Sequence, residues 1–120
     1  MTAQWTVLLQ NDFAAEVSGF SSNVRVKLVA MVEHLETFGP HAKRPQVDTL
    51  KGSKIANLKE FRFSADDGAW RVAFAFDEKR RSIVLAAGSK SGVPAAVFYK
   101  RLISLAETRM AKYEAAQKRE

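Results

Sequence analysis

Residues 58–90 read LKEFRFSADDGAWRVAFAFDEKRRSIVLAAGSK, and this stretch decides the fold. Three runs in it alternate between large apolar residues and other residues: 58–64, 70–77 and 83–89. Such period-2 alternation is typical of strands with one buried face. The sequence Asp-Asp-Gly at 66–68 and the polar segment 78–82 separate the runs, as hairpin turns do. We therefore expect an antiparallel three-strand meander with one aromatic face.

The second face of this meander carries Arg62 and Arg71, and Lys90 closes its third strand. The remaining positions on this face are small: Ala73, Ala75, Ala86 and Gly88. Small residues make a strand face shallow, so we expect it to admit a flat or extended ligand close to the backbone. Arginine is also common on a solvated strand face, and the pattern alone fits that interpretation equally well.

Length and composition restrict the class of protein. The 120 residues are 47% hydrophobic and include eight Phe, which suits one globular domain over residues 1–120. The absence of cysteine excludes a disulfide framework and a cysteine zinc site. No apolar run is long enough to span a membrane, and residues 1–6 show no secretory signal. We expect a cytoplasmic protein that does not insert into a membrane.

Charge is distributed unevenly along the chain. The net charge is +6, but residues before position 42 sum to −2 and those from position 42 onward sum to +8. A basic excess confined to one part of a small domain favours a polyanion or an acidic protein as partner.

The segment 41–53 is expected to be an irregular basic connection, because Pro45 and Gly52 interrupt regular structure. The cations that we assign to the binding of a polyanion such as RNA lie in and after it: Lys43, Arg44, Lys51, Lys54 and Lys59. The segment precedes the first meander strand, which places it at the rim of the face with Arg62. Taken alone, it also fits a solvated connector.

Helices are expected on either side of the meander in sequence. Residues 5–9 fit a short strand that joins the sheet. Asn11 and Asp12 are helix-capping residues for a helix to about Val17, and a longer helix follows from the Ser-Ser-Asn at 21–23 to Gly39. This helical hairpin covers the aromatic face. The sequence thus predicts an α+β fold.

A last helix follows Pro94, and its expected inward stripe is Phe98, Leu102, Leu105 and Ala106. Tyr99 lies at the edge of that stripe, where its hydroxyl reaches the sheet. From about residue 111, charges alternate with alanines, so we expect a frayed helical tail.

The chain lacks the motifs of common hydrolases and nucleotide-binding proteins. We find no supported Ser-His-Asp spacing, no paired carboxylates and no glycine-rich phosphate loop. His34 has no second histidine at ligand spacing, and Met31 is a core residue, so neither metal nor cofactor is expected.

Four residues nevertheless suit cleavage of RNA by its own 2′-hydroxyl: Arg62, Arg71, Lys90 and Tyr99. Guanidinium groups stabilise the negative charge that gathers on phosphate oxygens in the transition state. Two nearby arginines would lower the pKa of Lys90 and suit it to proton transfer. Tyr99 is a second proton-transfer group or stacks on a base. The spacing leaves the general base and the general acid unassigned.

Residues 50–110 resemble the RelE superfamily of bacterial type II toxins, and more closely its HigB branch. The segments that carry the resemblance are Leu50-Lys51-Gly52, 57–63, 70–77, 88–90 and 98–102. Where RelE has lysines on the first meander strand, this chain has Glu60 and Arg62. The resemblance implies a RelE-like fold and a metal-independent endoribonuclease that enters the 70S ribosome, cuts messenger RNA and inhibits translation. It also implies a neutralising antitoxin, HigA-like with a helix-turn-helix DNA-binding domain.

The resemblance places the family's RNA-cleaving roles on Arg62, Arg71, Lys90 and Tyr99. Two other functions stay open at this point. The ParE branch shares the fold and inhibits DNA gyrase without nuclease activity. A noncatalytic RNA-binding domain is the third alternative, but the expected aromatic stacking pair is missing from the outward face.

Overall fold

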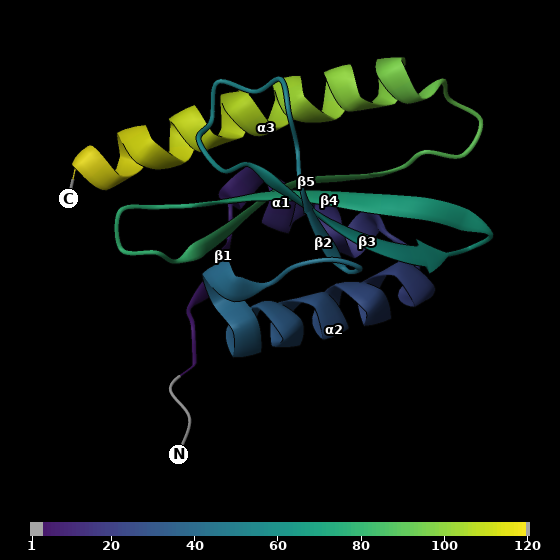
Figure 1. Cartoon of the computed structure of the whole chain (residues 1–120), viewed down its shortest axis with the longest axis horizontal. Helices are drawn as coiled ribbons and strands as arrows, with labels where there is room; N and C mark the ends of the chain where they lie inside the picture. Colours follow the sequence, from purple (N-terminus) through teal and green to yellow (C-terminus); the bar gives the residue numbers. More distant parts are fainter. Residues whose placement is uncertain (1–3, 120) are drawn as a thin grey trace.

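Helices cover both faces of one five-stranded sheet in the computed structural model, which describes residues 4–119 (Figure 1). In chain order the elements are β1 Val7–Leu9, α1 Asn11–Glu16, the 3-10 turn Val17–Gly19, α2 Ser22–Phe38, the 3-10 turn Gly39–His41, β2 Val47–Thr49, β3 Lys59–Ala65, β4 Gly68–Phe76, β5 Ser82–Ser89 and α3 Ala95–Lys118. The strand order is β1-β5-β4-β3-β2. The predicted α+β fold class is confirmed.

The predicted antiparallel meander is formed by β3, β4 and β5. Its first turn places Asp66 and Asp67 at positive φ, as a two-residue type I′ hairpin requires, and Ala65 pairs with Gly68. The Asp66 carboxylate accepts hydrogen bonds from Ser21 Oγ and, at 2.9 Å, from Asn23 Nδ2. The turn is thereby fixed to the start of α2.

The two outer strands differ from the expectation. β1 joins the sheet, but it runs parallel to β5, with Val7 opposite Ser82, so the sheet is mixed and not purely antiparallel. A parallel pair requires a long crossover, and the chain between β1 and β5 supplies it. We expected the segment 41–53 to be irregular. This was wrong for β2, which pairs antiparallel with β3. Pro45 precedes this strand, so its missing N–H lies outside the ladder.

The aromatic face packs against α1 and α2, as predicted. Phe74 and Phe13 are almost fully buried there with Met31 and Leu35 of α2. Ser21 Oγ accepts a hydrogen bond from Val24 N and begins α2. The cap of α1 is Gln10 rather than the expected Asn11 or Asp12, because its side chain accepts from two backbone N–H groups of the first turn.

The opposite face is covered by α3, so the expectation of an open, ligand-accepting floor was wrong. Buried Ala73 and Ala86 lie beneath Phe98 and Ala106 of the helix. Small residues on a sheet let a helix approach the backbone closely, which is the physical reason for this composition. Leu105, expected to face inward, is 39% exposed on the outer side of α3.

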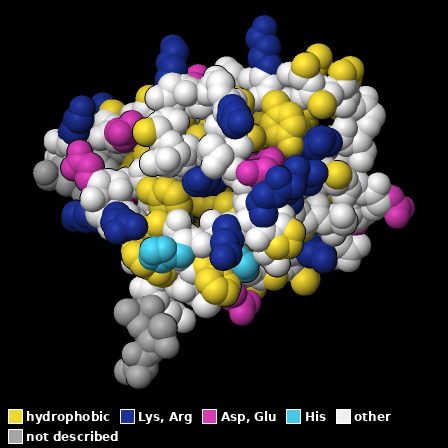
Figure 2. Space-filling view, in the orientation of Figure 1, with side chains coloured by type: hydrophobic (Ala, Val, Ile, Leu, Met, Phe, Trp, Pro, Cys, Tyr) yellow, Lys and Arg dark blue, Asp and Glu magenta, His cyan; other side chains and the backbone are white. Residues whose placement is uncertain are grey.

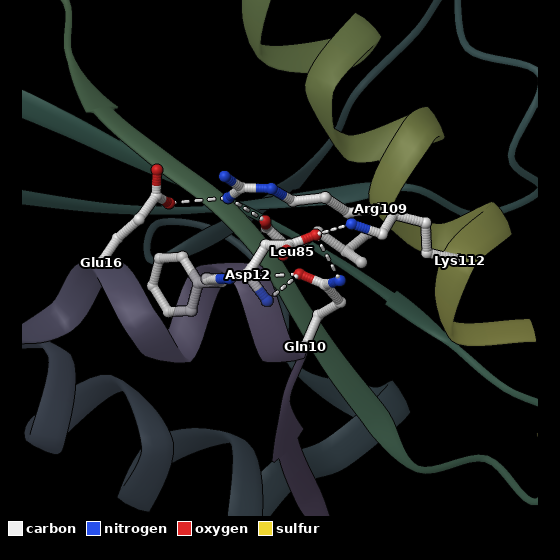
Figure 3. A network of polar contacts seen from close by, with 7 residues as sticks. Gln10, Asp12, Glu16, Leu85, Arg109 and Lys112 are labelled. Carbon is white, nitrogen blue, oxygen red and sulfur yellow. Dashed lines mark hydrogen bonds and ion pairs between the residues drawn. The ribbon is translucent and has the colours of Figure 1, made fainter. Parts of the chain in front are cut away.

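The C-terminal half of α3 is tied to the sheet and to α1 (Figure 3). Arg109 is buried, and its Nη1 donates to Glu16 Oε1 at 2.7 Å and to the Leu85 carbonyl oxygen at 3.0 Å. Tyr113 donates to Asp77 Oδ2 at 2.7 Å, and the helix continues to Lys118. These contacts hold the segment after residue 111, where the sequence suggested a frayed tail, in regular helix.

Within residues 4–119, no helix has both the length and the low charge that crossing a bilayer demands.

We predict that Phe74→Ala destabilises the fold by about 3–5 kcal/mol, because it removes a fully buried ring between the sheet and α2. The matched control is Phe38→Ala, which truncates a ring that is 47% exposed and should cost about 0.5 kcal/mol. Urea unfolding followed by circular dichroism measures both. Equal losses of stability would contradict the assignment of the buried face.

Candidate functional site

The carboxylate of Glu60 is the centre of a polar cluster at the side of the sheet that faces α3. Its side chain is only 6% exposed. Tyr99 Oη donates a hydrogen bond to Glu60 Oε1 at 2.8 Å. Arg71 Nε lies 3.5 Å from Oε1, and Arg62 Nε lies 3.6 Å from Oε2. Glu60 is thus paired with one neutral donor and two cations, as a buried carboxylate requires.

Arg62 and Arg71 are direct cross-strand neighbours in the register of β3 and β4. Like charges in that arrangement repel each other, and the carboxylate between their Nε atoms offsets the repulsion. Both Nε atoms are buried without a hydrogen-bond partner, because Glu60 lies at ion-pair rather than hydrogen-bond distance. The Arg62 side chain is 32% exposed and that of Arg71 is 13% exposed, so an anion reaches Arg62 more readily.

Lys90 and Tyr99 complete the cluster. Lys90 follows β5, and its Nζ lies 5.3 Å from the centroid of the Tyr99 ring, within cation–π range. Burial is the main cause that raises the pKa of Tyr99, and the hydrogen bond to Glu60 adds to it. The phenol therefore keeps its proton at neutral pH. The structure brings together all four residues that the sequence identified for catalysis.

The predicted RNA-binding cations lie in three places. Arg44 Nη1 is 3.8 Å from Asp48 Oδ2, and Asp48 is the register partner of Glu60, so Arg44 flanks the cluster. Lys43 precedes Arg44 and is exposed. Figure 2 shows Lys and Arg side chains spread across the visible side of the molecule, with acidic groups between them.

The loop after β2 carries Lys51 and Lys54, both exposed. It is fixed to α3, because Glu107 Oε2 accepts hydrogen bonds from Ser53 Oγ at 2.9 Å and from Lys54 N at 2.7 Å. This loop is therefore held at the rim of the α3 side.

Lys59 lies on the other side of the sheet. It has the strand parity of Phe61, and its Nζ donates to Thr49 Oγ1 at 2.8 Å. Sequence reasoning grouped Lys59 with the rim cations because it overlooked this parity. We therefore separate it from the arginine cluster.

Sequence reasoning also overlooked Glu60, which it gave no role on the second face of the meander. The available signal was its spacing: Glu60 and Arg62 share one face of a strand, and Arg71 shares that face on the next strand. An acid among cations at such positions indicates a counter-ion.

Among residues 4–119, no three His, Asp or Glu side chains gather in an arrangement that could hold a metal ion. His34 packs against Phe61 with ring centroids 5.3 Å apart, and burial lowers its pKa. The histidine is a half-buried packing residue.

Comparisons with known proteins identify the family and the fold. The family model described as "Phage derived protein Gp49-like (DUF891)" matches residues 15–111. Two Mycobacterium tuberculosis proteins named as candidate toxins are similar over 89 residues each: HigB2 at 38% identity over 73% of this chain, and HigB3 at 34% identity over 74% of it. The matched part is 44% of HigB2 and 67% of HigB3, so the chain spans under half of the first relative.

The fold is also found in a solved structure of the E. coli toxin RelE, a double mutant in its free state. The TM-score is 0.55 at 11% sequence identity, with 84% of this chain and 95% of that chain covered. At that identity the likeness concerns the fold. Because the family model covers most of the described residues, the chain belongs to the Gp49-like family, has HigB proteins among its relatives and shares the fold of RelE.

Proposed function

We propose that this chain is the toxin of a type II toxin-antitoxin system, a metal-independent endoribonuclease that cuts messenger RNA on the ribosome. The observation that carries the proposal is the pair Arg62 and Arg71, held side by side next to Tyr99 and Lys90. Its relatives' names support the toxin role. The mRNA, the 70S ribosome and a HigA-like antitoxin are the proposed partners, in the cytoplasm.

The reaction follows from the groups present. The 2′-hydroxyl of one nucleotide loses its proton to a water molecule, its oxygen attacks the adjacent phosphorus, and the bond to the 5′-oxygen of the next nucleotide breaks. The products are a 2′,3′-cyclic phosphate and a 5′-hydroxyl end. Negative charge grows on the non-bridging phosphate oxygens, and two guanidinium groups fixed in advance stabilise it without reorganising.

Proton transfer is the second requirement. Since burial and Glu60 keep Tyr99 protonated, we assign the phenol to donate a proton to the departing 5′-oxygen. Lys90 places a further positive charge beside the phenol. Glu60 is a positioning residue, because it contacts the Nε side of both arginines. Arg71 Nη1 donates to the Trp70 carbonyl oxygen at 2.9 Å, so Arg71 offers the phosphate its remaining N–H groups.

The rim cations extend this site into an RNA path. Arg44, Lys43, Lys51 and Lys54 are exposed, and we assign to them non-specific affinity for the RNA backbone. Lys59 is excluded from this path by its position on the opposite face of β3.

We predict that Arg71→Ala abolishes growth arrest, because the phosphate loses one of two fixed cations, while the thermal melt shows a folded protein. Lys79→Ala is the control: it removes one exposed positive charge from the turn between β4 and β5 and should leave toxicity intact. A fully toxic Arg71→Ala variant would remove this residue from the mechanism.

We expect new 5′ ends on translated messages after induction of the wild-type chain, and none on the same messages when a mutated start codon prevents their translation. Mapping of 5′ ends in both strains measures this. Intact messages together with gyrase-dependent DNA breaks would instead favour the ParE-like alternative.

The Tyr99 phenol provides a test of the cluster that needs no substrate. In a Tyr113→Phe background, absorbance at 295 nm should show that Tyr99 titrates above its usual pKa of 10. Adding Glu60→Gln should lower that pKa, because the variant removes a carboxylate that favours the neutral phenol.

The raised pKa of Tyr99 also predicts how the free energy of unfolding depends on pH. Below pH 10 the phenol is neutral in both the folded and the unfolded protein, so its full contribution to the free energy of unfolding is present. Above pH 10 the unfolded chain loses the phenol proton first, so stability falls with rising pH. The fall should be smaller in the Glu60→Gln variant. Identical titrations would contradict the Tyr99–Glu60 contact.

A further inference from the structure

An apolar groove of about 390 Å³ lies between α1 and α2, on the side of the sheet opposite the arginine cluster. Its apolar lining comes from both helices, from β1 and from the 3-10 turn after α1: Leu9, Phe13, Val17, Leu28, Val29, Met31 and Val32. Val29 is 59% exposed and Leu9 is 39% exposed, although both are apolar. Exposed apolar surface of this kind marks an interaction site.

The groove has an acidic margin in a basic protein. Glu33 and Glu36 line one end, one helical turn apart, and within residues 4–119 neither carboxylate forms an ion pair. Arg25 lines the groove too, but its Nη1 donates to the carbonyl oxygens of Ser18 and Phe20. The margin therefore attracts cations and repels nucleic acid, although the whole chain carries a net charge of +6.

The walls of the groove determine what shape of partner it fits. They are helices, whose backbone groups bond within their own helix, so they offer a partner few main-chain hydrogen bonds. A segment that enters a dry apolar groove must then form its backbone hydrogen bonds within itself, and a helix does so. The lining residues of α2 run from 25 to 36, a distance of about 17 Å at 1.5 Å per residue, which matches three turns of a partner helix.

We propose that this groove binds an amphipathic helix of the antitoxin. The helix has apolar residues at i, i+3 or i+4 and i+7 facing Val29, and Lys or Arg residues at the end that lies against Glu33 and Glu36. This inference rests on the proposed function for its partner. Because α2 and α3 cover opposite faces of the sheet (Figure 1), the helix binds without filling the arginine cluster.

A second copy of the chain is the competing occupant. The outer side of α3 carries exposed Val97 and Leu105 beside Lys100 and Arg101, a suitable composition for an acidic apolar groove. However, α3 and the groove face opposite directions, so a two-fold dimer cannot insert both helices at once. Such contacts would build open chains of molecules, and sedimentation of the purified chain detects them.

The test measures binding of the purified protein encoded next to this chain's gene, by calorimetry, to the wild type and to Val29→Glu. We expect Val29→Glu to weaken binding at least about 30-fold, as at the centre of an interface. The control Val97→Glu changes a valine that is 40% exposed on α3 and should bind like the wild type. The double variant Glu33→Lys/Glu36→Lys should also bind more weakly, and its binding should improve with added salt.

In cells, Val29→Glu should still arrest growth and should escape neutralisation by the co-expressed partner. Thermal melts verify that the variant is folded. Wild-type affinity of Val29→Glu, or an equal loss in Val97→Glu, would overturn the proposal. So would concentration-dependent self-association that Val29→Glu abolishes, because a second copy would then occupy the groove. The calorimetric measurement of binding does not require RNA cleavage, so it tests the groove even if the chain does not cut RNA.

Discussion

The ion pairs of one buried carboxylate with two arginines are the constraint on which the candidate site depends. Arg62 and Arg71 face each other across β3 and β4, an arrangement that like charges disfavour. Glu60 lies between their Nε atoms and also accepts a hydrogen bond from the Tyr99 hydroxyl of α3. The carboxylate thereby couples two strands and a helix, and it fixes three functional groups relative to one another.

The position of α3 explains why the site occupies one part of the sheet. Small side chains such as Ala73 and Ala86 let the helix lie directly on the strands. The helix thus buries the floor that the sequence had suggested for a ligand. The cluster lies where α3 begins, and Arg109 and Tyr113 fix the far part of the helix to β5 and to the β4–β5 turn. The anchors at the C-terminal half therefore support the position of Tyr99.

Sequence reasoning predicted the meander because period-2 alternation depends on local residues. It also predicted that Arg62 and Arg71 share a face, because strand parity fixes that relation. It could not predict that α3 covers the alanine face or that β1 runs parallel to β5, since these are long-range packing outcomes. The strand β2 was overlooked because it has only three residues and lies between Pro45 and Gly52, which indicate irregular structure. Burial of Glu60 depends on Tyr99, 39 residues later in the chain.

The proposed cleavage depends on the RNA's own 2′-hydroxyl at the cut. The most direct measurement uses purified chain, ribosomes and a message with one 2′-deoxynucleotide immediately 5′ of the mapped cut. We predict that this single change prevents the cut and that the all-ribose message yields a 2′,3′-cyclic phosphate end. Cleavage of the 2′-deoxy message at the same position would contradict this mechanism, because water would then be the attacking group.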